Sequence, residues 1–365
     1  MSLAILGLGT AVPERRVSQA DALALALELW PYTEEQRRLL PLLYRRAGVQ
    51  QRHTVLAPPA GGMLRAVAPR DVHEGRAAPG AVPTTAERLA VYAREAGPLA
   101  CRAAAAALAE AGLEPDRISH LVTVSCTGAA APGLDVALVR RLELRDDVER
   151  THVGFMGCQG ALAGLRVARA FTDADPAARV LLCAAELCSL HFFYGWDSEK
   201  IVANALFADG AAALVAGRHG GAGDASLAVT ASGSRLLPES EDAMSWAVGD
   251  HGFAMTLSAR VPALIEEHLP GWLDGWLAAQ GLARADVASW AVHPGGPRIL
   301  GAVEQALELP RAATAAAREL LASHGNMSSP TVLFLLQRLR AEGAPRPAVA
   351  LGFGPGLVAE AALLR

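Results

Sequence analysis

Val153-Gly-Phe-Met-Gly-Cys-Gln-Gly-Ala-Leu-Ala-Gly164 joins an apolar run to a stretch of Ala, Leu and Arg with helical spacing. This pattern predicts a strand followed by a helix, with Cys158 at the N-terminal end of the helix. There the helix dipole and the free backbone N–H groups favour a thiolate, the nucleophilic form of cysteine. The flanking Gly157 and Gly160 let a substrate carbonyl approach the sulfur closely. A free cysteine is more often a buried structural residue, so this stretch alone leaves both roles open.

The composition is that of a folded α/β protein. Of the 365 residues 52% are hydrophobic and 5% aromatic, which argues against disorder and allows one large or two medium domains. The formal net charge of −4 gives no overall basic signal for nucleic acid. Lys200 is the only lysine, so arginine forks or helix ends would have to hold most phosphate groups of a substrate.

The cysteines and the hydropathy predict a cytoplasmic location. The five cysteines lack the spacing of a metal site, and their odd number suggests reduced thiols; they are Cys101, Cys126, Cys158, Cys183 and Cys188. No apolar run reaches transmembrane length. The first nine residues have no basic region and predict a β-strand rather than a signal peptide.

Apolar runs that end in Gly or Pro predict buried strands, and periodic stretches predict helices. The predicted strands are Leu3–Gly9, His120–Ser125, His152–Phe155, Val180–Glu186 and Ala211–Ala216. The predicted helices are Ser18–Arg46, broken near Pro31 and Pro41, Thr84–Ala111, capped by Thr84 or Thr85, and Pro132–Leu144. Residues 57–84, rich in Pro, Gly and Ala, predict an irregular connection.

The second half of the chain repeats the pattern of the first. Gly112-Leu-Glu-Pro-Asp-Arg-Ile is echoed by Gly281-Leu-Ala-Arg-Ala-Asp-Val, and Gly157-Cys158 is matched by Gly325-Asn326. The offset between such pairs stays near 168 residues, which is hard to obtain by chance. We therefore predict an α/β fold of two duplicated βαβαβ halves, residues 1–222 and 223–365, divided in a glycine-rich run.

The duplication also predicts where the functional site lies. Sites in open α/β sheets gather beyond the C-terminal ends of the strands. His293, in a Pro/Gly loop, follows a predicted strand, and Asn326 opens the helix equivalent to that of Cys158. Taken singly, such a histidine is more often a structural hydrogen-bonding residue and such an asparagine a helix cap. The pseudo-symmetry nevertheless brings Cys158 and Asn326 towards one crevice, with His293 one strand away.

Together these three residues supply the groups that acyl transfer needs. Cys158 is the nucleophile, His293 the base or cation that holds it as a thiolate, and Asn326 a neutral amide donor. His and Asn side chains can also form an oxyanion hole for the enolate of a thioester. An ion pair between Cys158 and His293 would keep the sulfur reactive below neutral pH.

At this point the chain resembles a known family, the type III polyketide synthases, which are enzymes similar to chalcone synthase. The matching segments are Gly157-Cys158, Ala205-Leu-Phe-Ala-Asp-Gly-Ala-Ala-Ala213, His293-Pro-Gly-Gly296, Gly325-Asn-Met-Ser-Ser329 and Gly352-Phe-Gly-Pro-Gly356. The resemblance implies a thiolase-like αβαβα fold of five layers and a homodimer. It also implies that Cys158, His293 and Asn326 are the catalytic triad, which condenses malonyl-CoA with an acyl-CoA starter and requires no metal or redox cofactor.

The resemblance also implies a substrate pocket and a CoA site. Phe207 matches a gatekeeper phenylalanine, and Met255 stands where the second gatekeeper aligns, a departure from the family pattern. The predicted pocket residues are Phe207, Met255, Glu186, Cys188, His191, Ser328, Gly352, Phe353, Gly354, Pro355 and Gly356. Strand-end packing, a second cap or a tight turn would also account for several of them. Arg46 and Arg52 are predicted to bind CoA phosphates, although a solvated basic helix end explains either arginine on its own.

The predicted product and two alternatives complete the hypothesis. Glu186-Leu-Cys-Ser-Leu190 is more similar to bacterial enzymes that make alkylpyrones or alkylresorcinols from aliphatic acyl-CoAs than to plant enzymes with aromatic starters. A ketoacyl-ACP synthase III would use the same triad for a single condensation, but usually has His-Gln-Ala-Asn where this chain has His293-Pro-Gly-Gly296. A non-catalytic partner with the thiolase fold would typically lack the nucleophile Cys158.

Overall fold

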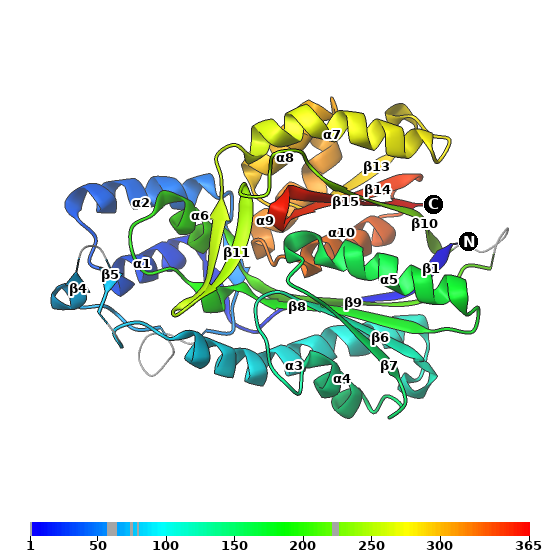
Figure 1. Ribbon diagram of the computed structural model, residues 1–365, viewed down its shortest axis with the longest axis horizontal. Coiled ribbons are helices and arrows are strands. Elements are labelled where there is room, and N and C mark those ends of the chain that lie inside the picture. The colour runs from blue at the N-terminus through cyan, green and yellow to red at the C-terminus, as the bar shows by residue number, and fades with distance from the viewer. Residues whose placement is uncertain (1, 57–63, 74–75, 79, 221–225) are drawn as a thin grey trace.

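A computed structural model describes residues 2–56, 64–73, 76–78, 80–220 and 226–365. The secondary-structure elements form five layers, in the order helices, sheet, helices, sheet, helices (Figure 1). This confirms the predicted αβαβα fold class. Parts of two predicted features, the irregular connection at 57–84 and the glycine-rich run at 217–223, lie outside the described residues.

The nine main strands form one hydrogen-bonded sheet whose two portions have matching order. The first portion runs β1-β9-β8-β6-β7 and the second β10-β15-β14-β13. The strands of the first are β1 (Leu3–Ala11), β9 (Asp209–Arg218), β8 (Val180–Leu187), β6 (His120–Ser125) and β7 (Glu149–Gly154). Those of the second are β10 (Leu227–Leu236), β15 (Val358–Leu364), β14 (Ala348–Gly354) and β13 (Ser289–Val292). A short antiparallel pairing of β1 with β10 joins the two portions, which occupy separate layers in Figure 1.

The helices cover both outer faces and fill the space between the two sheet layers. The outer helices are α3 (Thr85–Ala111) and α4 (Leu134–Leu142) on one face, and α7 (Val261–Ala278) and α8 (Pro297–Ala306) on the other. The central helices are α5 (Gly160–Ala174) and α10 (Pro330–Ala341), preceded in the chain by α9 (Ala315–His324). Helix α5 contacts β6 and β8 as well as β14 and β15. Its long run of buried residues follows from this position, because a helix between two sheets is apolar on both sides.

The close approach of α3 to β1 depends on glycine. A side chain at Gly7 or Gly9 would collide with the carbonyl oxygens of Ala107 and Ala103 on α3. The helix face at this contact consists of alanines, among them the fully buried Ala103, Ala104 and Ala107. Small residues on both elements therefore let the outer helix lie directly on the strand.

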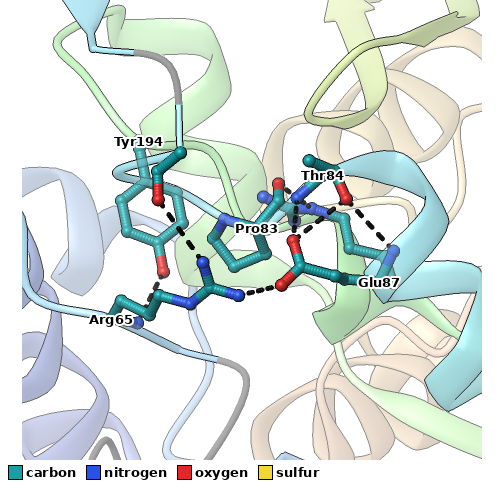
Figure 2. Close-up of polar contacts among 7 residues, drawn as sticks. Arg65, Pro83, Thr84, Glu87 and Tyr194 are labelled. Carbon is teal, nitrogen blue, oxygen red and sulfur yellow. Dashed lines mark hydrogen bonds and ion pairs between the residues drawn. The ribbon is translucent and has the colours of Figure 1, made fainter.

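The N-terminus of α3 carries the predicted cap. Thr84 Oγ1 accepts a hydrogen bond from the Glu87 backbone N–H at 3.2 Å, and the Glu87 carboxylate accepts one from the Thr84 N–H at 2.8 Å. Arg65 forms an ion pair with Glu87 and donates its backbone N–H to the Tyr194 hydroxyl (Figure 2). Of the two N-cap residues predicted, Thr84 or Thr85, the structure has Thr84, in a capping box with Glu87 that also fastens the segment around Arg65 to the helix.

A smaller group of elements lies at one end of the layers, where α1, α2, α6 and β11 appear together in Figure 1. The helices are α1 (Gln19–Leu29), α2 (Glu34–Arg46) and α6 (Ser198–Leu206). The strand pairs are β2 (Arg16–Ser18) with β3 (Gln51–His53), β4 (Val72–His73) with β5 (Arg76–Ala77), and β11 (Met244–Gly249) with β12 (Gly252–Leu257). This end also receives the C-terminal ends of β6, β8, β13 and β14, which is where the sequence predicts the functional site.

Two sequence predictions need correction. Pro41 does not break α2, which continues from Glu34 to Arg46. Proline removes one backbone hydrogen bond, but Leu40 and Tyr44 are buried and hold the helix against its neighbours. Residues 57–84 are not wholly irregular, because their described part includes the short pair β4 and β5.

No helix within the described ranges is both long enough and apolar enough to cross a membrane.

Candidate active site

Cys158 lies in a tight turn between β7 and α5. The chain passes through Phe155 and Gly157, both with positive φ, into a 3₁₀ turn over Gly157–Gln159, and α5 begins at Gly160. Residue 157 must be glycine, because a side chain there would collide with the Pro355 ring. Cys158 is 8% exposed. The turn therefore places its thiol at the N-terminal end of α5, as predicted.

Asn326 reaches the same point from the other half of the chain. Its backbone bridges to α6, with its N–H donating to the Leu206 carbonyl at 2.9 Å and its carbonyl accepting from the Ala208 N–H at 2.9 Å. The Cys158 sulfur lies 3.9 Å from Nδ2 and 4.0 Å from Oδ1 of Asn326. Oδ1 accepts the backbone N–H of Ser328 at 2.8 Å. This bond fixes the orientation of the amide, so that Nδ2 faces the Cys158 sulfur and its second N–H can donate to a ligand.

Helix α10 begins later than the sequence pattern predicts. It starts at Pro330, so Asn326 lies in the turn before the helix and is not its first residue. Ser328, within that turn, has a φ of 59°, in the left-handed region that few residues other than glycine adopt. The strained turn presents both the Asn326 amide and the Ser328 side chain to the site, a type of geometry that clusters at functional positions.

His293 follows β13 and completes the group. Its backbone N–H donates to the Leu351 carbonyl at 2.8 Å, and the side chain is 1% exposed. Neither ring nitrogen has a hydrogen-bond partner among the described residues. Cys158, His293 and Asn326 line one cavity of about 20 Å³ together with Met255 and Phe353. A buried imidazole with two free nitrogens beside a thiol is available to a substrate rather than committed to the fold.

Burial shifts the pKa values of the thiol and the imidazole in opposite directions. Loss of water around the thiolate raises the pKa of Cys158 to about 11, although hydrogen bonds from Ser328 and Asn326 oppose this shift. Loss of water around the imidazolium lowers the pKa of His293 to about 3. Neither charge is stable alone, whereas a thiolate beside an imidazolium forms a pair of zero net charge, and the N-terminus of α5 favours its anion. The ion pair predicted from the sequence therefore requires both residues.

We expect His293→Ala to make the thiol of Cys158 hard to ionise. The thiolate must then form alone, against a pKa of about 11. Alkylation by iodoacetamide follows the thiolate fraction, so its rate in the variant should rise only in alkaline solution. The wild-type rate should reach its midpoint below the free-thiol value of about 8.5. The measurement is the alkylation rate of Cys158 against pH, followed by intact mass; coincident midpoints would show that His293 does not activate the thiol.

Three cavities lie at or next to Cys158, His293 and Asn326. Besides the cavity of about 20 Å³, one of about 30 Å³ borders Cys158, Ser328 and Pro355. A larger, mainly apolar cavity of about 310 Å³ opens to the surface. The larger two share Cys188, Phe207, Trp246 and Met255, so a single layer of side chains divides them. Phe207 and Met255, the predicted gatekeepers, both belong to this layer, and Met255 borders all three cavities.

The Gly352-Phe-Gly-Pro-Gly356 loop packs against the turn that holds Cys158. Phe353 and Pro355 line the two small cavities. A side chain at Gly354 would collide with the Met156 carbonyl and with Gln159, beside the nucleophile, and Gly356 has a positive φ. Two of the five residues therefore form cavity wall, and the glycines allow the loop to approach the nucleophile turn.

Glu186 was predicted to line the pocket, and this prediction is wrong. Its side chain is fully buried and borders none of the three cavities. The carboxylate accepts hydrogen bonds from the N–H groups of Cys126 and Thr127 at 2.9 and 3.1 Å, and from the Ser329 hydroxyl at 2.6 Å. Glu186 thus holds the loop after β6 against the segment that carries Asn326, behind the cavity wall.

His191 and Cys188 do line the open cavity. His191 Nδ1 accepts the Phe253 N–H at 2.9 Å, so Nε2 carries the proton and donates to the Thr127 carbonyl at 2.7 Å. Burial lowers the pKa of His191 to about 4, which keeps the ring neutral. His191 therefore both forms cavity wall and ties β12 to the loop after β6.

The two arginines predicted for CoA have different environments. Arg52 is buried, and its guanidinium donates to the carbonyls of Asn204, Ala205 and Phe207 and to the Gln19 side chain. It therefore stabilises the C-terminal end of α6 and is not available to a phosphate, which corrects the prediction for Arg52. Arg46 is exposed in the last turn of α2. The segment that follows α2 packs against the start of α8: Gly48 lies close to Pro297.

The sequence analysis missed several residues of the site. Trp246 lies in the dividing layer and donates its indole N–H to the Cys126 carbonyl at 2.7 Å. Cys126 and Met244 also line the cavity of about 30 Å³. The aromatic and apolar residues around 244–257 were a signal for a buried hairpin, but nothing in their spacing indicates which cavity such a hairpin would cover.

Comparison with known proteins identifies the family. The model of the chalcone and stilbene synthase N-terminal domain matches residues 2–220, and that of the C-terminal domain matches residues 228–365. The chain is 37% identical to 1,3,6,8-tetrahydroxynaphthalene synthase of Streptomyces peucetius subsp. caesius, over 98% of this chain and 91% of the relative. It is 32% identical to the alpha-pyrone synthesis polyketide synthase-like Pks18 of Mycobacterium tuberculosis, over 98% of this chain and 90% of that relative.

The fold agrees with solved structures of the same class. The crystal structure of PKS-I from the brown alga Ectocarpus siliculosus superposes with a TM-score of 0.89 at 32% identity and covers 100% of this chain and 98% of that one. The C-terminal type III polyketide synthase domain of Steely1 from Dictyostelium superposes with a TM-score of 0.89 at 27% identity, over 100% of this chain and 99% of that one. The chain therefore belongs to the chalcone and stilbene synthase family of type III polyketide synthases.

Proposed function

We propose that the enzyme loads an aliphatic acyl group from acyl-CoA onto Cys158, extends it several times with malonyl-CoA and cyclises it to an alkylpyrone or alkylresorcinol type of product. The observation that carries this proposal is the apolar cavity of about 310 Å³ one side-chain layer away from the cavity at Cys158. A cavity of this size and polarity suits an alkyl chain. The name of the Pks18 relative refers to alpha-pyrones, in agreement with the proposal.

The proposed loading step uses Cys158 and His293. The thiol proton passes to the free imidazole, and the thiolate attacks the carbonyl carbon of the acyl-CoA. The C–S bond to CoA breaks, the imidazolium returns its proton to the departing CoA thiolate, and the acyl group remains as a thioester on Cys158. Because the thiol is 8% exposed, the thioester forms in a site from which bulk water is largely excluded.

The proposed extension step uses His293 and Asn326. Malonyl-CoA loses carbon dioxide, and the resulting enolate oxygen accepts hydrogen bonds from the N–H of the neutral imidazole and from Asn326 Nδ2. The enolate carbon then attacks the Cys158 thioester, forms the new C–C bond and releases the thiolate. Both donors lie in the second half of the chain and line the same cavity as the sulfur of Cys158, which belongs to the first half; this is the arrangement that electrostatic stabilisation of an enolate requires. We propose that Arg46 contributes to CoA binding outside this cavity.

The test is an assay of the purified enzyme with malonyl-CoA and a series of acyl-CoAs from acetyl to dodecanoyl, without carrier protein, with products identified by mass spectrometry. The proposal predicts alkylated pyrones or resorcinols extended by two or more malonyl units. Single-condensation products that need a carrier protein would favour a ketoacyl-ACP synthase. Aromatic products from malonyl-CoA alone would instead point to the chemistry named for the Streptomyces relative.

We expect Met255→Trp to restrict the enzyme to short starters. Methionine is flexible and can move aside for a chain that passes between the cavities, whereas a rigid indole fills the dividing layer. Overpacking of this kind costs about 1–3 kcal/mol, so kcat/KM for decanoyl-CoA should fall by about tenfold or more, with acetyl-CoA little affected. Thr256→Trp, at the exposed neighbouring position of β12, is the matched control. An equal loss for both starters would show that Met255 does not gate the larger cavity.

Three further proposals rest on general arguments. A homodimer follows from the family resemblance. A cytoplasmic location follows from the scattered free cysteines. A division of the chain into residues 1–222 and 223–365 follows from the internal duplication.

A further inference from the structure

The open cavity has an uneven distribution of charge. Its wall includes three cationic side chains, those of Arg15, Arg52 and Lys200, the histidines His191 and His251, and no Asp or Glu among the described residues. Arg52 and His191 are committed to hydrogen bonds within the fold. Arg15 and His251 are exposed, and Lys200 is half-buried, so these three lie where the cavity opens.

Arg15 is the most available of these cations. Its guanidinium makes no hydrogen bond or ion pair with the part of the chain that the structure describes. Several other exposed arginines are paired with carboxylates, for example Arg94 with Glu95, Arg145 with Asp147 and Arg260 with Asp242. The Lys200 ammonium lies 4.9 Å from the centre of the Phe193 ring and forms an ion pair with Asp197, with 3.3 Å between Nζ and Oδ2. A cavity with positive groups at its opening and no acidic residue in its wall attracts an anion.

The interior of the same cavity is apolar. Leu25, Leu56, Leu64, Phe192 and Phe253 line it, and its inner end is the layer that contains Phe207 and Met255. An acyl chain attached to Cys158 that passes this layer would run along apolar side chains and end beside Arg15 and Lys200. A methyl terminus at that point gains nothing from the charges, whereas a carboxylate can accept charge-assisted hydrogen bonds from either cation.

We infer that the preferred starter carries a second carboxylate at its far end, that is, that the enzyme accepts ω-carboxyacyl-CoA in preference to the methyl-terminated acyl-CoA of equal length. This inference rests on the proposed function, since it requires the starter chain to occupy the open cavity. Arg15 and Lys200 are then specificity-determining residues that act at the end of the chain remote from Cys158.

The experiment compares octanoyl-CoA with the mono-CoA thioester of octanedioic acid, each with malonyl-CoA. The wild-type enzyme should show a ratio of kcat/KM that favours the dicarboxylic starter by about tenfold, and raising the salt concentration should lower this ratio. Arg15→Gln and Lys200→Gln should each bring the ratio close to one. Arg16→Gln is the matched control, because Arg16 is the exposed neighbour of Arg15 in the chain but does not line the cavity.

Each outcome decides between the alternatives. A wild-type ratio of one or below, with no effect of Arg15→Gln, would overturn the inference while leaving the proposed function in place. If Arg15→Gln instead lowers kcat/KM for both starters equally and raises the KM for malonyl-CoA, the cations bind the phosphates of CoA and the inference is wrong. If neither starter is extended although malonyl-CoA alone gives product, the proposed function fails and the inference with it.

Discussion

Cys158→Ala should abolish polyketide formation while leaving the protein folded. The Cys158 thiol lies at the N-terminus of α5, 3.9 Å from Asn326 Nδ2, and lines one cavity with His293. Alanine has no group that can hold an acyl chain covalently. Removal of a covalent nucleophile in other enzymes lowers kcat by about 10⁴-fold or more. The measurement is extended product per enzyme, by mass spectrometry, from malonyl-CoA with the best acyl-CoA starter.

The Cys158→Ala variant also separates the two chemical steps. In the proposed mechanism the decarboxylation of malonyl-CoA depends on His293 and Asn326 and not on Cys158, so we expect carbon dioxide release to persist in the variant. Cys101→Ala is the matched control, because Cys101 is a half-buried thiol on α3 that borders none of the cavities. Extended product from a preparation of Cys158→Ala free of wild type would overturn the assignment of the nucleophile.

Asn326→Asp should slow decarboxylation far more than acyl loading. One oxygen of the new carboxylate can still accept the Ser328 N–H, as Oδ1 does now at 2.8 Å. The other replaces the donor Nδ2 and repels the developing enolate. Loss of one oxyanion donor costs about 3 kcal/mol, roughly a hundredfold in rate or more. The rates to compare are carbon dioxide release from malonyl-CoA and formation of the acyl-enzyme from acyl-CoA alone.

Ser323→Ala provides the control for this substitution. Ser323 lies in the last turn of α9, close in sequence to Asn326, but among the described residues its hydroxyl bonds only to helix carbonyls and to His324. Both rates should be unchanged in that variant. If Asn326→Asp decarboxylates normally but fails to load acyl-CoA, the role proposed for Asn326 is incorrect.

Features that depend on neighbouring residues could be predicted from the sequence. The turn at Cys158, the cap at Thr84 and most strands follow from local signals such as glycine position, capping residues and apolar runs. The internal repeat also allowed one long-range prediction. An offset near 168 residues relates Cys158 to Asn326 without any knowledge of the fold. The structure confirms that the two side chains lie 3.9 Å apart.

Features that depend on distant partners could not be predicted in this way. Arg52 follows a basic helix end and suggests a surface cation, but its hydrogen-bond acceptors are carbonyls on α6, about 150 residues later in the chain. Glu186 ends a strand near the site, yet the groups that bind it come from the loop after β6 and from Ser329. Whether a polar residue faces a cavity or supports its wall is decided by these long-range partners, which a single sequence does not show.

The most direct test of the account is the intact mass of the wild-type enzyme after brief incubation with octanoyl-CoA alone, in the absence of carrier protein. The account predicts one added octanoyl group, located on Cys158 by peptide mapping and removed when malonyl-CoA is supplied, with concurrent appearance of extended product. An octanoyl group on any other residue, or an unmodified enzyme that nevertheless forms extended product, would contradict it.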